Sequence, residues 1–311
     1  MVPSPTFHDR VHGMLTGTAV GDGLGAPFEG REVVPATALT RWAFSSQALH
    51  HTDDTVMTLV LAEHLSHQGG INQAVLASDF AVAWHHEPLR GYGPGAAQVL
   101  AAVLGGTAWR QAAVSVFPTG SWGNGAAMRA APVAAVSRTV LEAAHLGRRS
   151  AEITHAHEHG LHGAALQAAA AHLALHSDLS VALDAAAFLD QLHPVVPSRA
   201  WHEKLLEIRA LLARQAGPEE AAALLGHDVS ALGSVPLAVY VFLARAESPE
   251  AAFRFAVSCG GDTDTIAAMT GALIGARHGH TRLPAAWTTR LEAAHQITAT
   301  AARLVSASID T

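Results

Sequence analysis

The amino-acid sequence predicts an all-α fold, on two observations. Apolar side chains recur at helical spacing along almost the whole chain, as at Leu205, Ile208, Leu211 and Leu212, and the alternating runs typical of β-strands are nearly absent. Half of the residues are hydrophobic, yet only 5% are aromatic and 14% are charged, and alanine dominates the apolar share. This composition suits closely packed helices. The 311 residues could fill two domains, but no segment resembles a linker, so we expect a single domain over residues 1–311.

Periodicity, caps and breaks divide the chain into predicted helices separated by short loops. The helices cover approximately residues 7–20, 53–67, 71–86, 94–104, 127–136, 139–145, 148–159, 161–176, 180–192, 198–215, 218–225, 234–246, 249–258, 264–278 and 284–307. The breaks rich in glycine and proline lie at residues 21–30, 90–95, 117–125, 193–198 and 260–262. Because chemistry usually sits on loops held by a rigid scaffold, we expect the functional site there.

Charge excludes one class of partner. The chain has 19 basic and 26 acidic side chains, and its formal charge is -7. It therefore lacks the broad cationic surface that neutralises nucleic-acid phosphates, and we expect no direct nucleic-acid binding. An anionic small molecule can still be held by backbone N–H groups and bound metal ions.

Cysteine content and hydropathy indicate the compartment. The single cysteine, Cys259, excludes an intrachain disulfide framework and a thiolate zinc cage, and fits a reducing environment. Residues 1–10 contain no apolar core of a signal peptide, and no apolar run approaches the roughly 18 residues that a membrane span needs. We expect a soluble cytoplasmic protein without membrane contact, and we favour a monomer.

Two acidic motifs at opposite ends of the chain stand out, Thr52-Asp53-Asp54-Thr55 and Asp262-Thr263-Asp264-Thr265. Each lies where a helix is predicted to begin, and either motif alone can be explained as a helix cap. A cap needs one side-chain oxygen, however, whereas each motif supplies two carboxylates and two hydroxyls, and the extra like charges repel unless something positive lies between them. An oxygen-only ligand set of this kind selects Mg²⁺ or Mn²⁺ over zinc or copper.

Two glycine-rich segments add candidate groups. Glu29, which closes the segment at residues 21–29, is a fifth carboxylate that could ligate metal or hold a water, and a solvated loop acid is the alternative. In the segment at residues 120–125, three glycines free backbone N–H groups ahead of a predicted helix, and this arrangement receives pyrophosphate. An ordinary glycine-rich lead-in to a helix is the alternative there.

In this order the motifs resemble the ADP-ribosylglycohydrolase family. They are Gly-Asp-x-Leu-Gly from Gly21 with Glu29 after it, Thr52-Asp53-Asp54-Thr55, Gly-Ser-Trp-Gly-Asn-Gly-Ala-Ala-Met-Arg at residues 120–129, Thr154-His155, and Gly260-Gly261 followed by the second acidic motif and Ile266. Each motif is weak alone, but five in the right order are specific, and they span about residues 11–279. Residues 120–129, 154–175 and 234–243 look most like the branch that removes serine-linked ADP-ribose and trims poly(ADP-ribose), and less like the arginine-specific branch.

The resemblance implies an orthogonal multi-helix bundle with a di-magnesium cleft, Mn²⁺ being the alternative metal. It implies a hydrolase that releases ADP-ribose from modified protein side chains, with serine O-linkage favoured, or from poly(ADP-ribose) or O-acyl-ADP-ribose; its partners would be ADP-ribose and ADP-ribosylated proteins. The implied metal ligands are Thr52, Asp53, Asp54, Asp262, Asp264 and Thr265, and the implied catalytic residues are Glu29, Asp53 and Asp54. The implied substrate contacts are Gly91, Phe117, Gly120, Ser121, Trp122, Gly123, Asn124, His155 and Val229.

Other functions are weighed beside this one. An arginine-specific hydrolase, a catalytically silent ADP-ribose-binding protein of the same fold, and a di-metal phosphohydrolase acting on nucleotides stay open. Trp122 stands where the related branch often has tyrosine, which leaves the acceptor open. A zinc site in the histidine cluster at residues 155–162 is disfavoured, because histidines clustered on a helix are more often surface or core residues than zinc ligands. Ser121 lacks the strand that precedes a nucleophile elbow, so serine-hydrolase chemistry is rejected.

Overall fold

The structure, a computed structural model, describes residues 5–309. Within that range the regular secondary structure is helical, and the all-α prediction is confirmed. The α-helices are α1 (Phe7–Gly25), α2 (Ala36–Ala43), α3 (Asp53–Gln68), α4 (Gln73–His86), α5 (Pro94–Leu104), α6 (Trp109–Ala112), α7 (Val140–Ala151), α8 (Glu158–Leu175), α9 (Ala185–Leu192), α10 (Arg199–Ala213), α11 (Pro218–Leu225), α12 (Ala231–Ala244), α13 (Pro249–Ser258), α14 (Thr263–His278), α15 (Ala285–Thr288) and α16 (Ala294–Ile309). The 3₁₀ helices are η1 (Ala26–Phe28), η2 (Ala131–Val136), η3 (His193–Val195) and η4 (His280–Arg282).

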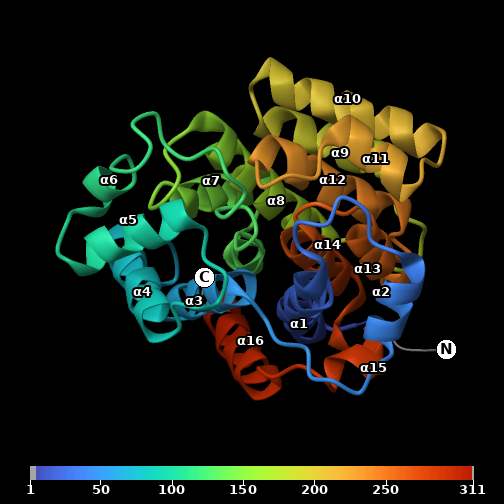
Figure 1. Cartoon of the computed structure of the whole chain (residues 1–311), viewed down its shortest axis with the longest axis horizontal. Coiled ribbons are helices and arrows are strands. Elements are labelled where there is room, and N and C mark those ends of the chain that lie inside the picture. The colour runs from blue at the N-terminus through green and yellow to red at the C-terminus, as the bar shows by residue number, and fades with distance from the viewer. Residues whose placement is uncertain (1–4, 310–311) are drawn as a thin grey trace.

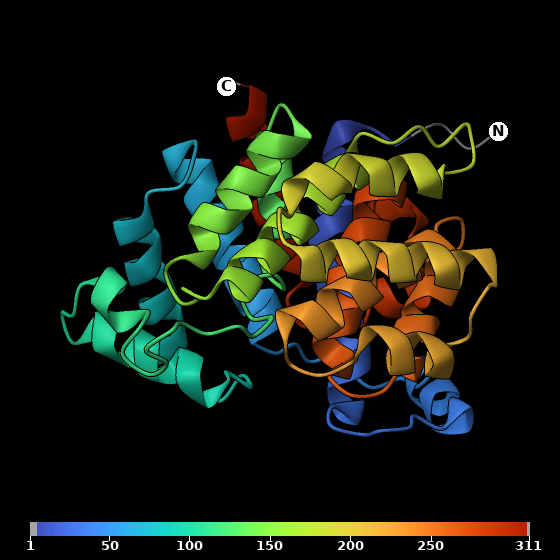
Figure 2. The same cartoon turned by 90° about the horizontal axis from the view of Figure 1, so that it is seen from above.

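Helices α1 and α14 lie side by side in the middle of the fold (Figures 1 and 2). Their backbones approach so closely that only glycine fits between them. A Cβ atom on Gly17 would stand 2.0 Å from the carbonyl oxygen of Gly271, and one on Gly21 would stand 2.0 Å from that of Ala267. Because α1 ends at Gly25 and α14 begins at Thr263, this contact places the C-terminal end of α1 beside the N-terminus of α14.

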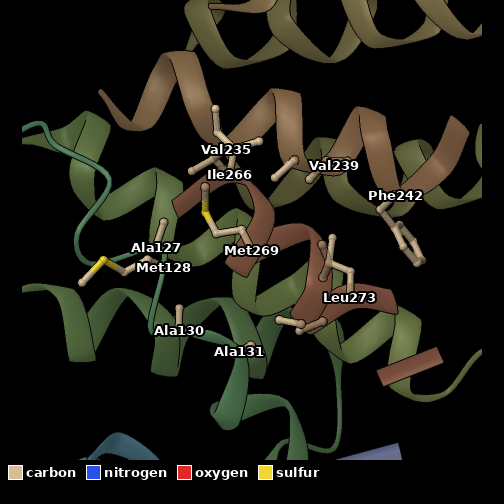
Figure 3. Close-up of a cluster of buried hydrophobic side chains, with 14 of the residues drawn as sticks. Ala127, Met128, Ala130, Ala131, Val235, Val239, Phe242, Ile266, Met269 and Leu273 are labelled. Atoms are coloured by element: carbon tan, nitrogen blue, oxygen red, sulfur yellow. The ribbon is translucent and has the colours of Figure 1, made fainter. Parts of the chain in front are cut away.

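The hydrophobic core is built around α14, which is buried along its whole length. Figure 3 shows Ile266, Met269 and Leu273 of this helix lying between α12 and the segment at residues 127–131. Helices α8 and α13 also pack on α14, and α3 and α16 pack on α1. Helices α4, α5 and α6 form an outlying group, at the left of Figure 1, that joins the rest mainly through α3. Buried hydrophobic residues from the large helices form one cluster.

Isolated β-bridges take the place of a sheet and fix loops to one another. Within residues 5–309 these two-residue contacts join Arg31 to Gly261, Leu49 to Leu291, and Gly123 to Ser230. The first and third link segments that carry predicted site residues. None of the helices in this range has the length and hydropathy required to cross a bilayer.

Most predicted helices are confirmed to within a few residues, but the prediction between residues 139 and 159 is wrong. The segment was expected to form two helices broken near Gly147, whereas α7 runs from Val140 through Gly147 to Ala151. The glycine is not a break, because it allows close packing on α8: a Cβ atom there would stand 2.7 Å from the carbonyl oxygen of Ala164. The break instead falls at residues 152–157 and carries Thr154 and His155.

Other boundaries differ as well. Helix α1 continues to Gly25, into the break predicted at residues 21–30, because its glycines pack closely on α14. Residues 284–307 form α15 and α16 rather than one helix, since Arg290 and Glu292 between them hydrogen-bond to the loop at residues 42–51. Residues 127–136 form a turn and then the 3₁₀ helix η2, in which Pro132 lacks an N–H donor. Helix α9 begins at Ala185 instead of residue 180, because Asp184 caps it. Helices α2 and α6 were not predicted at all.

Candidate active site

The two acidic motifs meet in space. Thr52 caps α3, and the hydroxyl of Thr52 lies 3.3 Å from Oδ2 of Asp54. The hydroxyl of Thr265, from the first turn of α14, donates to the same Asp54 oxygen at 3.3 Å. Asp54 and Asp264 are therefore neighbours although 210 positions separate them in sequence, and both are buried.

Glu29 joins this group from the loop that follows α1. One carboxylate oxygen from each of Glu29, Asp262 and Asp264 lies within 4.8 Å of the others. The loop is held in place by the bridge to the turn before α14: the N–H of Gly30 donates to Gly261 at 2.8 Å, and the N–H of Gly261 donates to Arg31 at 2.8 Å. Glu29 itself is exposed, whereas the two aspartates are buried, so Glu29 lies at the solvent side of the cluster.

Asp22 is a buried acid that the sequence reasoning did not single out as a site residue. It projects from the last turns of α1 and is fully inaccessible to solvent. Its carboxylate accepts hydrogen bonds from the N–H of Thr52, at 3.0 and 2.9 Å, and from the N–H and hydroxyl of Thr55, at 3.1 and 2.6 Å. Asp22 therefore anchors the start of α3 to α1. The signal in the sequence was an acid between two glycines, Gly21 and Gly23, at the end of a predicted helix.

Crowding of buried carboxylates dominates the electrostatics of the cluster. Burial, and then the neighbouring acids, raises the pKa of Asp53 to about 7 and that of Asp264 to about 9. The same two causes raise the pKa of Asp54 well above its usual range, with Asp264 the largest charge acting on it. Burial also raises the pKa of Asp22 to about 6 and, together with the charge of Asp262, raises that of Glu29. Such a group favours protonation or a cation.

The donor set fits divalent cations. Oδ1 of Asp54 and Oδ1 of Asp264 are buried and have no hydrogen-bond partner among residues 5–309. Buried polar atoms without partners are rare in folded proteins, and carboxylate and hydroxyl oxygens are the ligands that hard cations prefer. The cluster is therefore an acidic site that could bind metal.

The cluster forms one end of a cavity of about 300 Å³, a volume at the lower end of the range for ligand pockets. Most of the predicted site residues line it. They are Glu29, Asp53, Asp54, Gly91, Phe117, Ser121, Gly123, Asn124, His155, Val229, Asp262, Asp264 and Thr265. A larger hollow of about 430 Å³ lies between α3 and α4, but its His64 is already hydrogen-bonded to Asp79, and none of the predicted site residues lines it.

Three predicted residues do not line the cavity. Thr52 donates hydrogen bonds to two acids instead, from its backbone N–H to Asp22 and from its hydroxyl to Asp54. Gly120 has a φ of +82° and packs on the backbone of residues 156 and 157, so it sets the conformation of the loop without lining the cavity. Trp122 is 57% exposed, with its ring near that of His157, and its carbonyl accepts the N–H of Ala231.

Asn124 lines the cavity, yet its side chain is largely used within the protein. The amide nitrogen of Asn124 donates to Asp262 Oδ2 and to the hydroxyl of Ser234, which orients the Asp262 carboxylate. The main-chain N–H of Asn124 donates to the carbonyl of Val229 at 2.9 Å, and this hydrogen bond joins the glycine-rich loop to the loop before α12.

Some residues of the cavity wall were not predicted. Sequence reasoning missed Met57, Gly93, Pro94, Gly95, Ala96, Val99, Gly125, Met128, Arg129 and Thr154. Gly125, Met128, Arg129 and Thr154 lay in motifs that had been noticed, although none of them was named as a site residue. The others, from α3 and from the start of α5, carry no chemical signal in the sequence.

Comparison with known proteins agrees with the fold and gives the family. A family model described as ADP-ribosylglycohydrolase matches residues 3–310. The chain is 33% identical over 318 residues to ADP-ribosylhydrolase ARH3 of Homo sapiens, covering 89% of this chain and 88% of that relative. It is 28% identical over 285 residues to an uncharacterized protein of Archaeoglobus fulgidus, covering 87% and 88%. A solved structure described as an ADP-ribosylglycohydrolase-related protein complex has a TM-score of 0.72 and 26% identity, covering 97% of this chain and 99% of that one.

Fold and site thus define an all-helical hydrolase with an acidic cluster in its cavity. The chain belongs to the ADP-ribosylglycohydrolase family, and it is a hydrolase that acts on the glycosidic bond of ADP-ribose.

Proposed function

We propose that this enzyme releases ADP-ribose from serine-linked ADP-ribosyl groups on proteins, with poly(ADP-ribose) and O-acyl-ADP-ribose as further substrates, and that it depends on divalent cations. The observation that carries the metal dependence is the pair of unpartnered buried oxygens on Asp54 and Asp264, at helix starts joined through Thr265. The similarity to ADP-ribosylhydrolase ARH3 over most of both chains supports the hydrolysis of ADP-ribosyl bonds. The preference for serine rests on the resemblance of residues 120–129, 154–175 and 234–243 to the serine-specific branch.

The cofactor we propose is two Mg²⁺ ions, with Mn²⁺ as a substitute. Their ligands would be Thr52, Asp53, Asp54, Asp262, Asp264 and Thr265. When bound, the ions would supply positive charge that polarises ribose hydroxyls and a water. The side chains of Asp22 and Asn124 would hold the ligands in place, because they bond to Thr52 and to Asp262.

The reaction needs a water on one side of the sugar and a departing oxygen on the other. The bond between the anomeric carbon and the acceptor oxygen breaks through a state with positive charge on the sugar, which nearby carboxylates stabilise. We assign alignment of the water to Asp53 and Asp54. Glu29 lies at the exposed side of the cluster, and its raised pKa suits it to take the proton of the attacking water, while the leaving oxygen on the other side of the sugar takes a proton from solvent.

The rest of the cavity would hold the nucleotide. The glycine-rich wall with Ser121 and Gly123 would lie against the diphosphate, on a loop whose conformation Gly120 sets. The N–H groups of Gly120 and Gly123 already donate to the carbonyl of Phe117 and to the hydroxyl of Ser121, so we assign the contact to the N–H and hydroxyl of Ser121. Phe117 and Trp122 would lie beside the diphosphate and the distal ribose, and Gly91 would lie on a loop over the site. His155 and Val229 would lie at the adenosine end, where His155 would donate to an oxygen of the ribose or of the adjoining phosphate. We also propose that the chain forms a single domain, which is supported by the one cluster of buried hydrophobic residues among those described, and that it acts as a monomer.

One substrate panel tests this proposal. Peptides with serine- or arginine-linked ADP-ribose, and poly(ADP-ribose), are incubated with the enzyme in EDTA and after Mg²⁺ is restored. We expect fastest release of free ADP-ribose from the serine peptide, loss in EDTA, and recovery with Mg²⁺. Asp264→Ala should be inactive under all conditions.

The other outcomes separate the alternatives. Fastest release from the arginine peptide would make the enzyme arginine-specific. Binding of ADP-ribose without release at saturating metal would indicate a silent binding protein. Phosphate release without free ADP-ribose would indicate a phosphohydrolase. Activity that survives EDTA, or survives in Asp264→Ala, would reject the metal-dependent scheme.

A further inference from the structure

Arg129 is a buried cation that forms no ion pair with an acid among residues 5–309, although the charge of Asp53 acts on it. Its side chain is 1% exposed, and in that range its hydrogen bonds go to neutral groups: the carbonyls of Gly125 and Ser150, the hydroxyl of Thr154 and the sulfur of Met57. Its guanidinium lies 4.4 Å from the centre of the Phe80 ring. Buried charges are usually paired, so a guanidinium held in this way behind a ligand cavity calls for a reason.

A short hydrogen-bond chain runs from Arg129 toward the cavity. Nη2 of Arg129 lies 2.9 Å from the hydroxyl oxygen of Thr154, and this oxygen lies 2.7 Å from Nδ1 of His155. Thr154 is 2% exposed and His155 is 4% exposed, so little water reaches either group.

The chemistry of the three groups fixes the direction of the chain. A guanidinium can only donate, so Arg129 uses a lone pair of the Thr154 oxygen. The Thr154 hydroxyl then has one proton to give, and Nδ1 of His155 is the acceptor within reach. If Nδ1 carried a proton instead, that nitrogen and Arg129 would both donate to Thr154, and the buried hydroxyl proton would have no acceptor. The arrangement that gives the Thr154 hydroxyl proton an acceptor leaves the proton of a neutral His155 on Nε2.

Nε2 of His155 lies beside Gly123 and Gly125, which line the cavity together with His155. Among residues 5–309 this nitrogen makes no hydrogen bond that would compete with a ligand, and His155 lines the cavity. Gly123 and Gly125 lie beside it, and a Cβ atom on either would stand 3.6 Å from Nε2. Burial, and then the charge of Arg129, lowers the pKa of His155 to about 3, so the ring stays neutral near pH 7.

We propose that Arg129 and Thr154 are positioning residues that hold His155 in the tautomer with its proton on Nε2, so that His155 donates a hydrogen bond to an oxygen of the nucleotide diphosphate or its ribose. This proposal rests on the proposed function for the identity of the ligand. It assigns no contact with the bond that breaks, so the effect falls on binding rather than on the chemical step.

Thr154→Val removes the hydroxyl while keeping the shape of the side chain. The tautomer is read from the imidazole ¹⁵N shifts of the histidine-labelled holoenzyme at pH 7, with His155 assigned by comparison with His155→Gln. We expect a protonated Nε2 in the native enzyme and a mixture of tautomers in Thr154→Val. Binding of ADP-ribose, measured by calorimetry with Mg²⁺, should weaken about tenfold, as for loss of one hydrogen bond to an anion. KM should rise by a similar factor while kcat changes by less than about twofold.

Two control variants separate positioning from packing. Thr154→Ser keeps the hydroxyl, so the tautomer and the affinity should return to native values. Thr58→Val makes the same substitution at a buried threonine whose hydroxyl has no partner among the described residues, and it should leave both unchanged. Protonation of His155 at Nδ1 in the native enzyme, or a Thr154→Val variant with native tautomer and affinity, would overturn the proposal. Because the ¹⁵N shifts do not depend on turnover, an enzyme with the predicted tautomer but no ADP-ribose release would instead reject the proposed function.

Discussion

Gly25→Ala tests whether the contact between α1 and α14 sets the geometry of the acidic cluster. A Cβ atom at this position would stand 2.4 Å from the carbonyl oxygen of Thr263 and 2.5 Å from Cα of Asp264. Since optimal contact between carbon atoms is about 3.5 Å, the first turn of α14 must move by about 1 Å. A displacement of this size at catalytic groups costs about 100-fold in rate. The overpacking should cost about 1–3 kcal/mol of stability, offset by up to about 1 kcal/mol because alanine favours helix over glycine.

Gly13→Ala is a matched control on the same helix pair. Its Cβ atom would stand 2.4 Å from the carbonyl oxygen of Gly275 and 2.5 Å from the carbonyl carbon of Gly279. The overlap is almost the same, but it lies about 18 Å along α1 from Gly25, at a rise of about 1.5 Å per residue. Both variants should lose similar stability in thermal melts, and only Gly25→Ala should lose about 100-fold in kcat/KM for ADP-ribose release from a serine-linked peptide. Equal kinetic losses in the two variants, or native kinetics in Gly25→Ala, would refute the reasoning.

Three further predictions concern anchoring, protons and the loop behind the cavity. Asp22→Asn removes the carboxylate that accepts hydrogen bonds from the N–H and the hydroxyl of Thr55. The free energy of unfolding in urea should fall by about 1–3 kcal/mol, and kcat should fall as well. Native values of both would mean that Asp22 does not anchor the start of α3. Because the folded-state pKa values of Asp53 and Asp264, about 7 and about 9, exceed the unfolded value near 4, the metal-free fold binds more protons than the unfolded chain across that range. Its stability should therefore fall as the pH rises from about 4 to about 9, and Mg²⁺ should raise the melting temperature more at pH 8 than at pH 5; a flat profile in EDTA would contradict this. Gly120→Ala forces φ of +82° on a side chain whose Cβ would stand 2.2 Å from the backbone nitrogen of residue 157, so it should cost at least about 2 kcal/mol and weaken ADP-ribose binding, whereas an unchanged melting temperature would exclude the strain.

The sequence reveals the acidic residues of the cluster better than it reveals the residues that hold them in place. Asp53, Asp54, Asp262 and Asp264 could be predicted because two carboxylates at a helix start exceed what a cap requires. Their meeting could not be derived from periodicity, since it depends on the glycine contact between α1 and α14. Asp22 escaped notice for the same reason: only its hydrogen bonds to a distant turn distinguish it from an ordinary helical acid.

The helices show a similar division. Long segments with a continuous apolar stripe and a clear cap, such as α3 with Thr52, were predicted almost to the residue. Helix α2 was missed because only Leu39 and Ala43 of its residues are buried, too few to establish a period. Gly147 misled the prediction for α7, because a glycine needed for close helix packing looks the same in sequence as one that ends a helix.

The most direct measurement is anomalous diffraction from crystals of the enzyme grown with Mn²⁺. The account predicts two anomalous peaks in the cluster, one or both within coordination distance of Asp54 and Asp264, and their loss in Asp264→Ala crystals. Mn²⁺ that binds only elsewhere, or an active native enzyme whose crystals show no peak in the cluster, would contradict it.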